Sequence, residues 1–129
     1  EKVLVKMKVF AAEILEPQNI QYQFSETGLM SGLSLNAKQR KNLFLIFKEA
    51  INNAAKYSQT KDISISLKQN GNTLSMSITD TGIGFEVQNA SKGNGLVNMN
   101  SRASGLGAKF SIKSAKGTGT SVVLEMPIT

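Results

Sequence analysis

The chain has 129 residues, enough for one domain with a single hydrophobic core, and it contains neither cysteine nor histidine. Disulfides, thiolate and imidazole metal sites, and histidine-dependent catalytic triads are therefore excluded. The formal net charge of +6 indicates an anionic partner. Nucleic acid is not expected, because the lysines are scattered and only eight aromatic side chains are present, so a phosphate-bearing small molecule or an acidic protein fits better.

The first element expected is a helix over residues 3–15. Apolar side chains at Leu4, Met7, Ala11 and Ile14 have helical spacing, and Pro17 ends the run. Residues 3–9 also alternate in polarity, so a strand is the alternative there. Lysines interrupt this segment, and no secretory signal is visible.

A strand and a long helix follow. Ile20, Tyr22 and Phe24 alternate with glutamines, which predicts a half-buried strand, and residues 26–34 are expected to form a loop. A helix is expected from about residue 37 to 58, with Asn36 and Gln39 forming a capping box at its start. Its apolar arc consists of Leu43, Ile46, Phe47, Ala50, Ile51, Ala54 and Tyr57. The other side carries Glu49, Asn52, Asn53 and Lys56, with Leu45 as the one apolar misfit.

The second half of the chain predicts more strands and one short helix. Alternation over residues 63–67 and 74–80, separated by Asn70-Gly71, predicts a hairpin. Asp80 continues the apolar row of the second strand, where a carboxylate is costly unless something pairs with it. Residues 96–106 predict a short helix capped by Gly107, and two strands follow at about 109–114 and 120–127. These elements predict an α+β fold with one core.

The polar face of the long helix is the first candidate site. Glu49, Asn53 and Lys56 are spaced i, i+4 and i+7, so they lie along one helix face and can reach one ligand. An asparagine oxygen suits Mg²⁺, which keeps several waters and bridges phosphates, and a lysine meets phosphate as a point charge. A solvated helix face is the simpler alternative.

A strand end with two glycines is the second candidate site. In the segment from Asp80 through Gly82 to Gly84, the glycines allow close backbone approach to a flat ligand. A buried carboxylate there can accept a hydrogen bond from the exocyclic amine of adenine, whereas guanine presents a carbonyl at that position. A plain turn is the alternative.

Two further glycine segments complete the candidates. Gly93 and Gly95 precede Leu96 at a helix start, where free backbone N–H groups can bind phosphate. The segment is neither a Walker A sequence nor a dinucleotide fingerprint. Gly119 precedes Thr120, whose hydroxyl can lie beside the base, directly or through water. Loops and tight turns without a ligand remain the alternatives.

Together these segments resemble the ATP-binding domain of bacterial two-component sensor histidine kinases, within the superfamily of gyrase, Hsp90, histidine kinases and MutL. The matching segments are EAINNAAKY at 49–57 (N box), DTGIGF at 80–85 (G1 box), GNGL at 93–96 (G2 box), and Gly119-Thr120 with Pro127 in the closing strand. The spacing of Gly95, Leu96, Met99 and Arg102 is most similar to the subfamily paired with NarL/LuxR-type response regulators.

The resemblance implies a two-layer α/β sandwich, the Bergerat ATP-binding fold, with a mixed sheet packed on helices. It implies ATP and Mg²⁺ as cofactors. By position it carries over Asn53 as the Mg²⁺ ligand, Asp80 as the adenine contact, Lys56 and Tyr57 on the phosphate side, and Gly93, Gly95 and Leu96 in the lid and its hinge. Glu49 matches the general base of the hydrolysing members. Tyr57 departs from the histidine frequent in this subfamily, and the lid is short.

The activity implied is transfer of the γ-phosphoryl group of Mg·ATP to a histidine on a separate dimerisation domain in two-component signal transduction. Residues 1–17 would then end a linker helix from that domain, and residues 18–129 would form the ATPase domain. The implied partners are the dimerisation domain of a homodimeric parent chain and a response regulator. The resemblance implies a cytoplasmic catalytic part, whether or not the parent is anchored in the inner membrane. Since the chain has no histidine, it is not expected to autophosphorylate alone.

Two other functions stay open at this point. One is a self-contained ATPase or a serine kinase of the anti-sigma type, in which Glu49 would activate water or a hydroxyl group. The other is a non-catalytic module that keeps the fold for nucleotide sensing or protein interaction. Steady turnover would distinguish the first, and absence of ATP affinity the second.

Overall fold

A computed structural model describes residues 2–28, 35–57, 61–82, 94–115 and 119–128. Five strands form one mixed sheet in the order β1-β2-β3-β5-β4. The pairing of β1 with β2 is parallel, and the other three pairings are antiparallel. The strands are β1 (Gln21–Thr27), β2 (Asp62–Asn70), β3 (Thr73–Asp80), β4 (Lys109–Ala115) and β5 (Gly119–Pro127).

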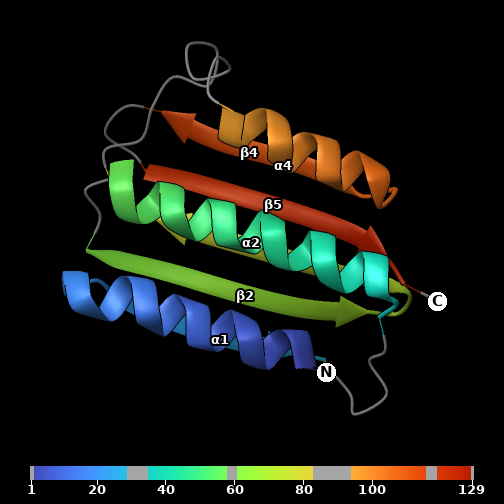
Figure 1. Cartoon of the computed structure of the whole chain (residues 1–129), viewed down its shortest axis with the longest axis horizontal. Helices are drawn as coiled ribbons and strands as arrows, with labels where there is room; N and C mark the ends of the chain where they lie inside the picture. Colours follow the sequence, from blue (N-terminus) through green and yellow to red (C-terminus); the bar gives the residue numbers. More distant parts are fainter. Residues whose placement is uncertain (1, 29–34, 58–60, 83–93, 116–118, 129) are drawn as a thin grey trace.

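Within these ranges, three helices cover one face of the sheet (Figure 1). They are α1 (Lys2–Leu15), α2 (Ala37–Tyr57) and α4 (Asn94–Gly105), and a short 3-10 turn, η1 (Glu16–Gln18), follows α1. The predicted two-layer α+β sandwich is thus confirmed, and the N-terminal segment is a helix rather than a strand. None of the helices in these ranges is both long and apolar enough to cross a bilayer.

The hydrophobic core lies between the helices and the sheet. The α1 residues that are buried in it are Val3, Met7, Ala11 and Leu15, whereas Leu4 and Ile14 are only partly buried. The buried row of α1 is therefore shifted from the predicted one, because it follows an i, i+4 line along α2. Residues 2–15 share one core with the rest of the chain, and their origin in a linker from another domain stays a prediction.

Helix α2 begins at the predicted capping box. The backbone N–H of Gln39 donates to Asn36 Oδ1 at 2.8 Å, and the backbone N–H of Asn36 donates to Gln39 Oε1 at 3.0 Å. These reciprocal bonds satisfy N–H groups that the first helical turn leaves without partners. The predicted apolar arc is buried from Leu43 to Ala54; the side chain of Tyr57 lies outside the described part.

Two turns follow the predicted glycine chemistry. Gly71, with φ of 62°, lies in the turn that connects β2 to β3. On either side of this turn, Asn70 of β2 pairs with Thr73 of β3. Gly107, with φ of 65°, follows α4, and its N–H donates to the carbonyl of Ser104 at 3.1 Å. Both positions need the left-handed conformation that glycine adopts without a steric penalty.

One end of the sheet gathers most of the candidate residues. In the register of β3 and β5, Asp80 pairs with Thr120, so β3 ends where β5 begins. At the same end β4 finishes, α2 finishes and α4 starts, on the left in Figure 1. We call this the Asp80 end. The fold thereby brings described parts of all four predicted segments, which are distant in sequence, to one side of the molecule.

Candidate functional site

Asp80 is the buried polar side chain at the end of β3. It is 5% exposed. The Asp80 Oδ1 atom accepts hydrogen bonds from the backbone N–H of Gly82 at 2.9 Å and from the backbone N–H of Thr120 at 3.3 Å. Burial raises the pKa of the Asp80 carboxyl above its ordinary value, and the two backbone bonds act in the opposite direction. Oδ1 is thus fixed by the protein backbone, and a carboxylate has a second oxygen that can accept a bond from a ligand.

Gly119 permits the close approach that holds Asp80 in place. Its φ is +89°, and a Cβ added there would lie 2.2 Å from the Asp80 backbone oxygen. On the next residue, the Thr120 hydroxyl lies 2.8 Å from the Ser114 hydroxyl of β4. The structure therefore unites the predicted Asp80, Gly82, Gly119 and Thr120 in one closely packed, hydrogen-bonded group.

The second predicted group lies on α2. Glu49 and Asn53 are partly buried, and Lys56 is exposed, so all three are accessible along one face of the helix. Asn53 and Lys56 belong to the last two turns of α2, at the Asp80 end. The accessible amide oxygen of Asn53 can bind a cation that bridges phosphates, and the ammonium group of Lys56 can contact a phosphate oxygen. Neither the cavity beside Glu49 nor the one beside Tyr22 includes Asp80 or Asn53 in its lining.

Several predicted residues can be placed only in part. Gly84 and Gly93 lie outside the described residues. Gly95 and Leu96 fall in the first turn of α4, as the prediction of a helix start after Gly93 requires. For these positions the roles in the lid and in phosphate binding stay predictions.

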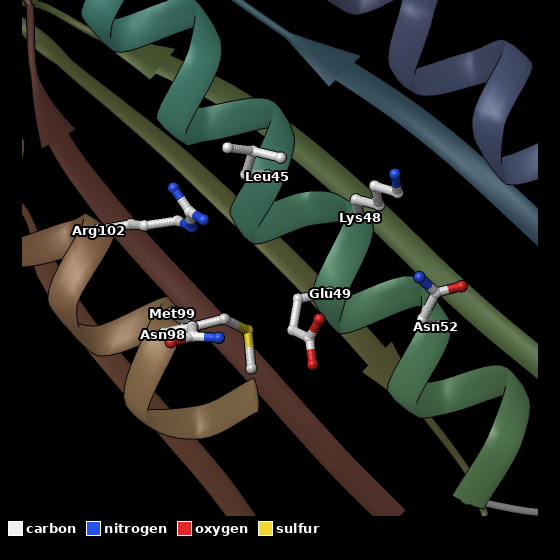
Figure 2. Close-up of a pocket in the computed structure, with 7 residues that line it drawn as sticks. All are labelled: Leu45, Lys48, Glu49, Asn52, Asn98, Met99 and Arg102. Carbon is white, nitrogen blue, oxygen red and sulfur yellow. The ribbon is translucent and has the colours of Figure 1, made fainter. Parts of the chain in front are cut away.

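A cavity of about 220 Å³ lies between α2 and α4 (Figure 2). Figure 2 shows Glu49 and Arg102 directed into the space between the two helices, with Lys48 and Asn52 directed outward. Arg102 Nη1 donates to Asn42 Oδ1 at 3.3 Å and so links α4 to α2. The lining residues are Leu45, Lys48, Glu49, Asn52, Asn98, Met99 and Arg102.

Of this lining, sequence reasoning had assigned a role only to Glu49. Leu45 was the apolar misfit on the polar face of α2, and it is only partly buried where it lines the cavity. Met99 and Arg102 are three residues apart, so they share one face of α4. The apolar Leu45 on α2 and the spacing of Met99 and Arg102 on α4 each indicated a further contact surface. Neither signal identified α4 as the helix that packs beside α2.

Comparison with known families gives one match that covers most of the chain. Residues 38–129 match the family described as histidine kinase-, DNA gyrase B-, and HSP90-like ATPase. The match includes all the candidate residues described above.

Curated relatives include three sensor histidine kinases. The oxygen sensor histidine kinase NreB of Staphylococcus carnosus is 37% identical over 89 residues, which cover 67% of this chain and 26% of that protein. Sensor histidine kinase YdfH of Bacillus subtilis is 32% identical, covering 73% of this chain and 24% of YdfH. Sensor histidine kinase LiaS of the same species is 26% identical, covering 88% and 30%. The chain thus spans about a quarter to a third of the relatives it matches.

Solved structures with the same fold also include histidine kinases. The histidine kinase domain of a blue-light activated kinase from Erythrobacter litoralis superposes with a TM-score of 0.78 at 19% identity, covering 98% of this chain and 61% of that one. The histidine kinase AdeS of Acinetobacter baumannii gives 0.79 at 15% identity, covering 99% and 64%. At these identities the similarity establishes the fold.

Proposed function

Because the chain belongs to the histidine kinase-, DNA gyrase B-, and HSP90-like ATPase family, we propose that it binds Mg·ATP and presents the γ-phosphoryl group to a histidine on a separate dimerisation domain. The names of the three curated relatives given above, each a sensor histidine kinase, favour the kinase branch of the family. In this proposal the chain is the ATP-binding part of a longer two-component kinase.

The observation that carries the proposal is the buried carboxylate of Asp80. Its Oδ1 is bound by the backbone, and the missing side chain of Gly119 leaves the strand end closely packed. In our proposal the carboxylate accepts a hydrogen bond from the exocyclic amine of adenine, with the Thr120 hydroxyl beside the base. Guanine would place a carbonyl oxygen against the same acceptor, so the site should favour ATP over GTP.

The phosphate side is assigned to the end of α2 and the start of α4. Asn53 would bind Mg²⁺ through its amide oxygen, and Lys56 and Tyr57 would lie near the phosphates. Gly82 and Gly84 would give the chain close access to the nucleotide, and Gly93, Gly95 and Leu96 would form the lid and its hinge. When bound, Mg²⁺ neutralises phosphate charge and orients the phosphoryl group, which is most of what phosphoryl transfer requires.

The partners in this proposal follow from what the chain lacks. With no histidine, it cannot provide its own phosphoacceptor. The acceptor would come from the dimerisation domain of a homodimeric parent, and the phosphoryl group would pass on to a response regulator. The spacing of Gly95, Leu96, Met99 and Arg102 favours a NarL/LuxR-type regulator. Because ATP is the substrate, this part of the parent would work in the cytoplasm.

Calorimetry with ATP and GTP, each with Mg²⁺, tests the proposal directly. We expect ATP to bind and GTP to bind at least about tenfold more weakly. Incubation of the chain alone with labelled ATP should give no phosphohistidine. Failure to bind ATP would support a non-catalytic module instead. Steady ATP turnover that is lost in Glu49→Ala would support a self-contained ATPase or a serine kinase.

A further inference from the structure

Helix α1 forms one rim of the molecule. It packs on α2 and lies at the lower edge of the helix layer in Figure 1. The sheet ends on the same side, because β1 is its terminal strand. Lys8 joins the two layers, since its Nζ atom lies 2.8 Å from Glu26 Oε1 of β1. A second molecule can therefore approach the outer side of α1 without displacing any described element.

The outer face of α1 carries two exposed apolar side chains. Val5 is 63% exposed and Val9 is 51% exposed, and they are the exposed large apolar residues of the described ranges. Because they are four positions apart, they lie on one face of the helix, away from the buried row through Met7 and Ala11. Two exposed valines do not by themselves identify a partner. The charges around them are more specific.

The charged side chains of α1 are placed against the helix dipole. The first turn contains Lys2 and no acidic residue, and the last turn contains Glu13 and no basic residue. A helix N-terminus favours negative charge and a C-terminus favours positive charge, so this order does not stabilise α1 itself. Among the described residues, Lys2, Lys6 and Glu13 take part in no ion pair. These charges are therefore accessible to a second molecule.

The same charges are arranged about Val9 with opposite signs on its two sides. Lys2 precedes Val9 by seven positions, and Glu16 of η1 follows it by seven. Lys6 precedes it by three positions, and Glu13 follows it by four. All four charged side chains are exposed. If two copies of α1 lie antiparallel with Val9 opposite Val9, each of these lysines faces a glutamate of the second copy.

We propose that two copies of this chain associate through α1, antiparallel about a two-fold axis at Val9. The contact is isologous, because each copy contributes the same face. Val9 packs on Val9 at the axis, and Lys6 of each copy pairs with Glu13 of the second copy. Each glutamate then lies toward the N-terminal half of the opposite helix, where the dipole favours it. The pairing requires neither nucleotide nor the proposed kinase function.

The size of this contact predicts a weak dimer. A helix of 14 residues is about 21 Å long and about 10 Å wide, which is on the order of 200 Å² in projection. A stable interface takes about 800 Å² from each partner. We therefore expect the dimer to form at high protein concentration. Two copies held together by a dimerisation domain, as in the proposed function, would reach an effective concentration in the millimolar range.

Single cysteines can trap such a dimer, because the chain contains no cysteine of its own. Val9→Cys places the two thiols at the two-fold axis. Val5→Cys places them about 12 Å apart along the helices, beyond the roughly 7 Å between Cα atoms that a disulfide can bridge. With oxidised glutathione and about 100 μM protein, we expect disulfide-linked dimers to form at least about tenfold faster in Val9→Cys.

Val5→Cys is the matched control, since Val5 is the more exposed of the two valines. Random collision would trap both variants at similar rates, and a parallel pairing would bring Val5 opposite Val5. Equal rates, or faster trapping in Val5→Cys, would therefore overturn the proposal.

Reversing charges tests the antiparallel direction. In the Val9→Cys protein, Lys6→Glu replaces two attractive contacts by repulsive ones and should slow trapping about fivefold at low salt. Adding Glu13→Lys should restore the rate. Lys109→Glu, at an exposed lysine of β4 on the opposite edge of the sheet, changes the net charge equally and should leave the rate within about twofold.

Circular dichroism verifies that each variant is folded. Trapping that does not respond to Lys6→Glu, or that Glu13→Lys does not restore, would overturn the pairing of these two residues across the dimer. ATP affinity should be the same in all these variants, because none of the substituted residues belongs to the proposed nucleotide site. Failure of the dimer and failure of ATP binding are therefore separate results.

Discussion

Asp80 and Thr120 are joined across β3 and β5 by a 3.3 Å hydrogen bond from the Thr120 backbone N–H to the Asp80 carboxylate. The two residues are register partners in adjacent strands, 40 positions apart in sequence. A buried carboxylate without a partner would be costly. This bond, together with that from Gly82, keeps the acid where a ligand can meet it.

Asp80→Asn should lower ATP affinity by at least about tenfold while the protein stays folded. A hydrogen bond to a charged group contributes about 1.5–3 kcal/mol. Since Oδ1 accepts both backbone bonds, the amide oxygen should take its place and turn the NH₂ group toward the amine of adenine. Calorimetry gives the affinity and circular dichroism the fold. Asp62→Asn, at an exposed acid of β2, is the control; equal affinity in both variants would contradict the assignment.

The stability of the nucleotide-free protein should depend on pH through Asp80. In the unfolded chain the carboxyl has its ordinary pKa of 3.8, and burial raises the pKa above this value in the folded state. At a pH between the unfolded-state pKa and the folded-state pKa, the folded protein therefore binds more protons than the unfolded chain. Its contribution to the free energy of unfolding is therefore greatest at low pH and is lost as pH rises through the folded-state pKa.

Urea unfolding of the wild type and Asp80→Asn, at intervals between about pH 4 and pH 7, measures this contribution. The difference in free energy of unfolding between the two proteins should shift in favour of Asp80→Asn as pH increases. Taking the difference removes the titration of the other carboxylates. A difference that stays constant over this range would show that burial does not perturb Asp80.

Asn53→Ala should weaken ATP binding mainly when Mg²⁺ is present. If the amide oxygen is a cation ligand, the substitution removes its contact with Mg²⁺. That contact is already absent when a chelator has removed the Mg²⁺. We expect about a tenfold increase in Kd with Mg²⁺ and a much smaller one without it, by calorimetry. Asn100→Ala, at an exposed asparagine of α4, is the control. Equal losses in both conditions would rule out the ligand role.

Gly119→Ala should destabilise the fold more than Gly71→Ala. Both glycines have positive φ, a conformation that costs other residues about 1–3 kcal/mol. Only at Gly119 would the new Cβ also meet Asp80, at 2.2 Å from its backbone oxygen; at Gly71 nothing lies within 4 Å. Thermal unfolding compares the two. Similar losses would mean that the strand ends separate easily and that the close packing around Asp80 is not required.

Local signals predicted most of the elements correctly. The bonds between Asn36 and Gln39, the turn at Gly71 and the cap at Gly107 all depend on residues within a few positions of one another. Such interactions are encoded in a short segment and need no knowledge of the fold. The burial of Asp80 was also expected, because it continues the alternating pattern of β3.

The sequence did not predict features that depend on a contact between elements distant in sequence. The buried row of α1 passes through Val3 and Leu15 rather than Leu4 and Ile14, since its position depends on how α1 lies on α2. Leu45 is an apolar residue on the polar face of α2, and the structure explains it because this side chain lines the cavity between α2 and α4.

The sequence by itself determined the chemical groups of the site, their order along the chain and the faces on which they lie, because periodicity and glycine conformation act locally. Only the tertiary structure decided that Asp80 would bond to Thr120 and that Glu49 would face a cavity shared with Arg102. Those relationships depend on strand register and on helix packing, which are set by the fit of whole surfaces rather than by any one segment.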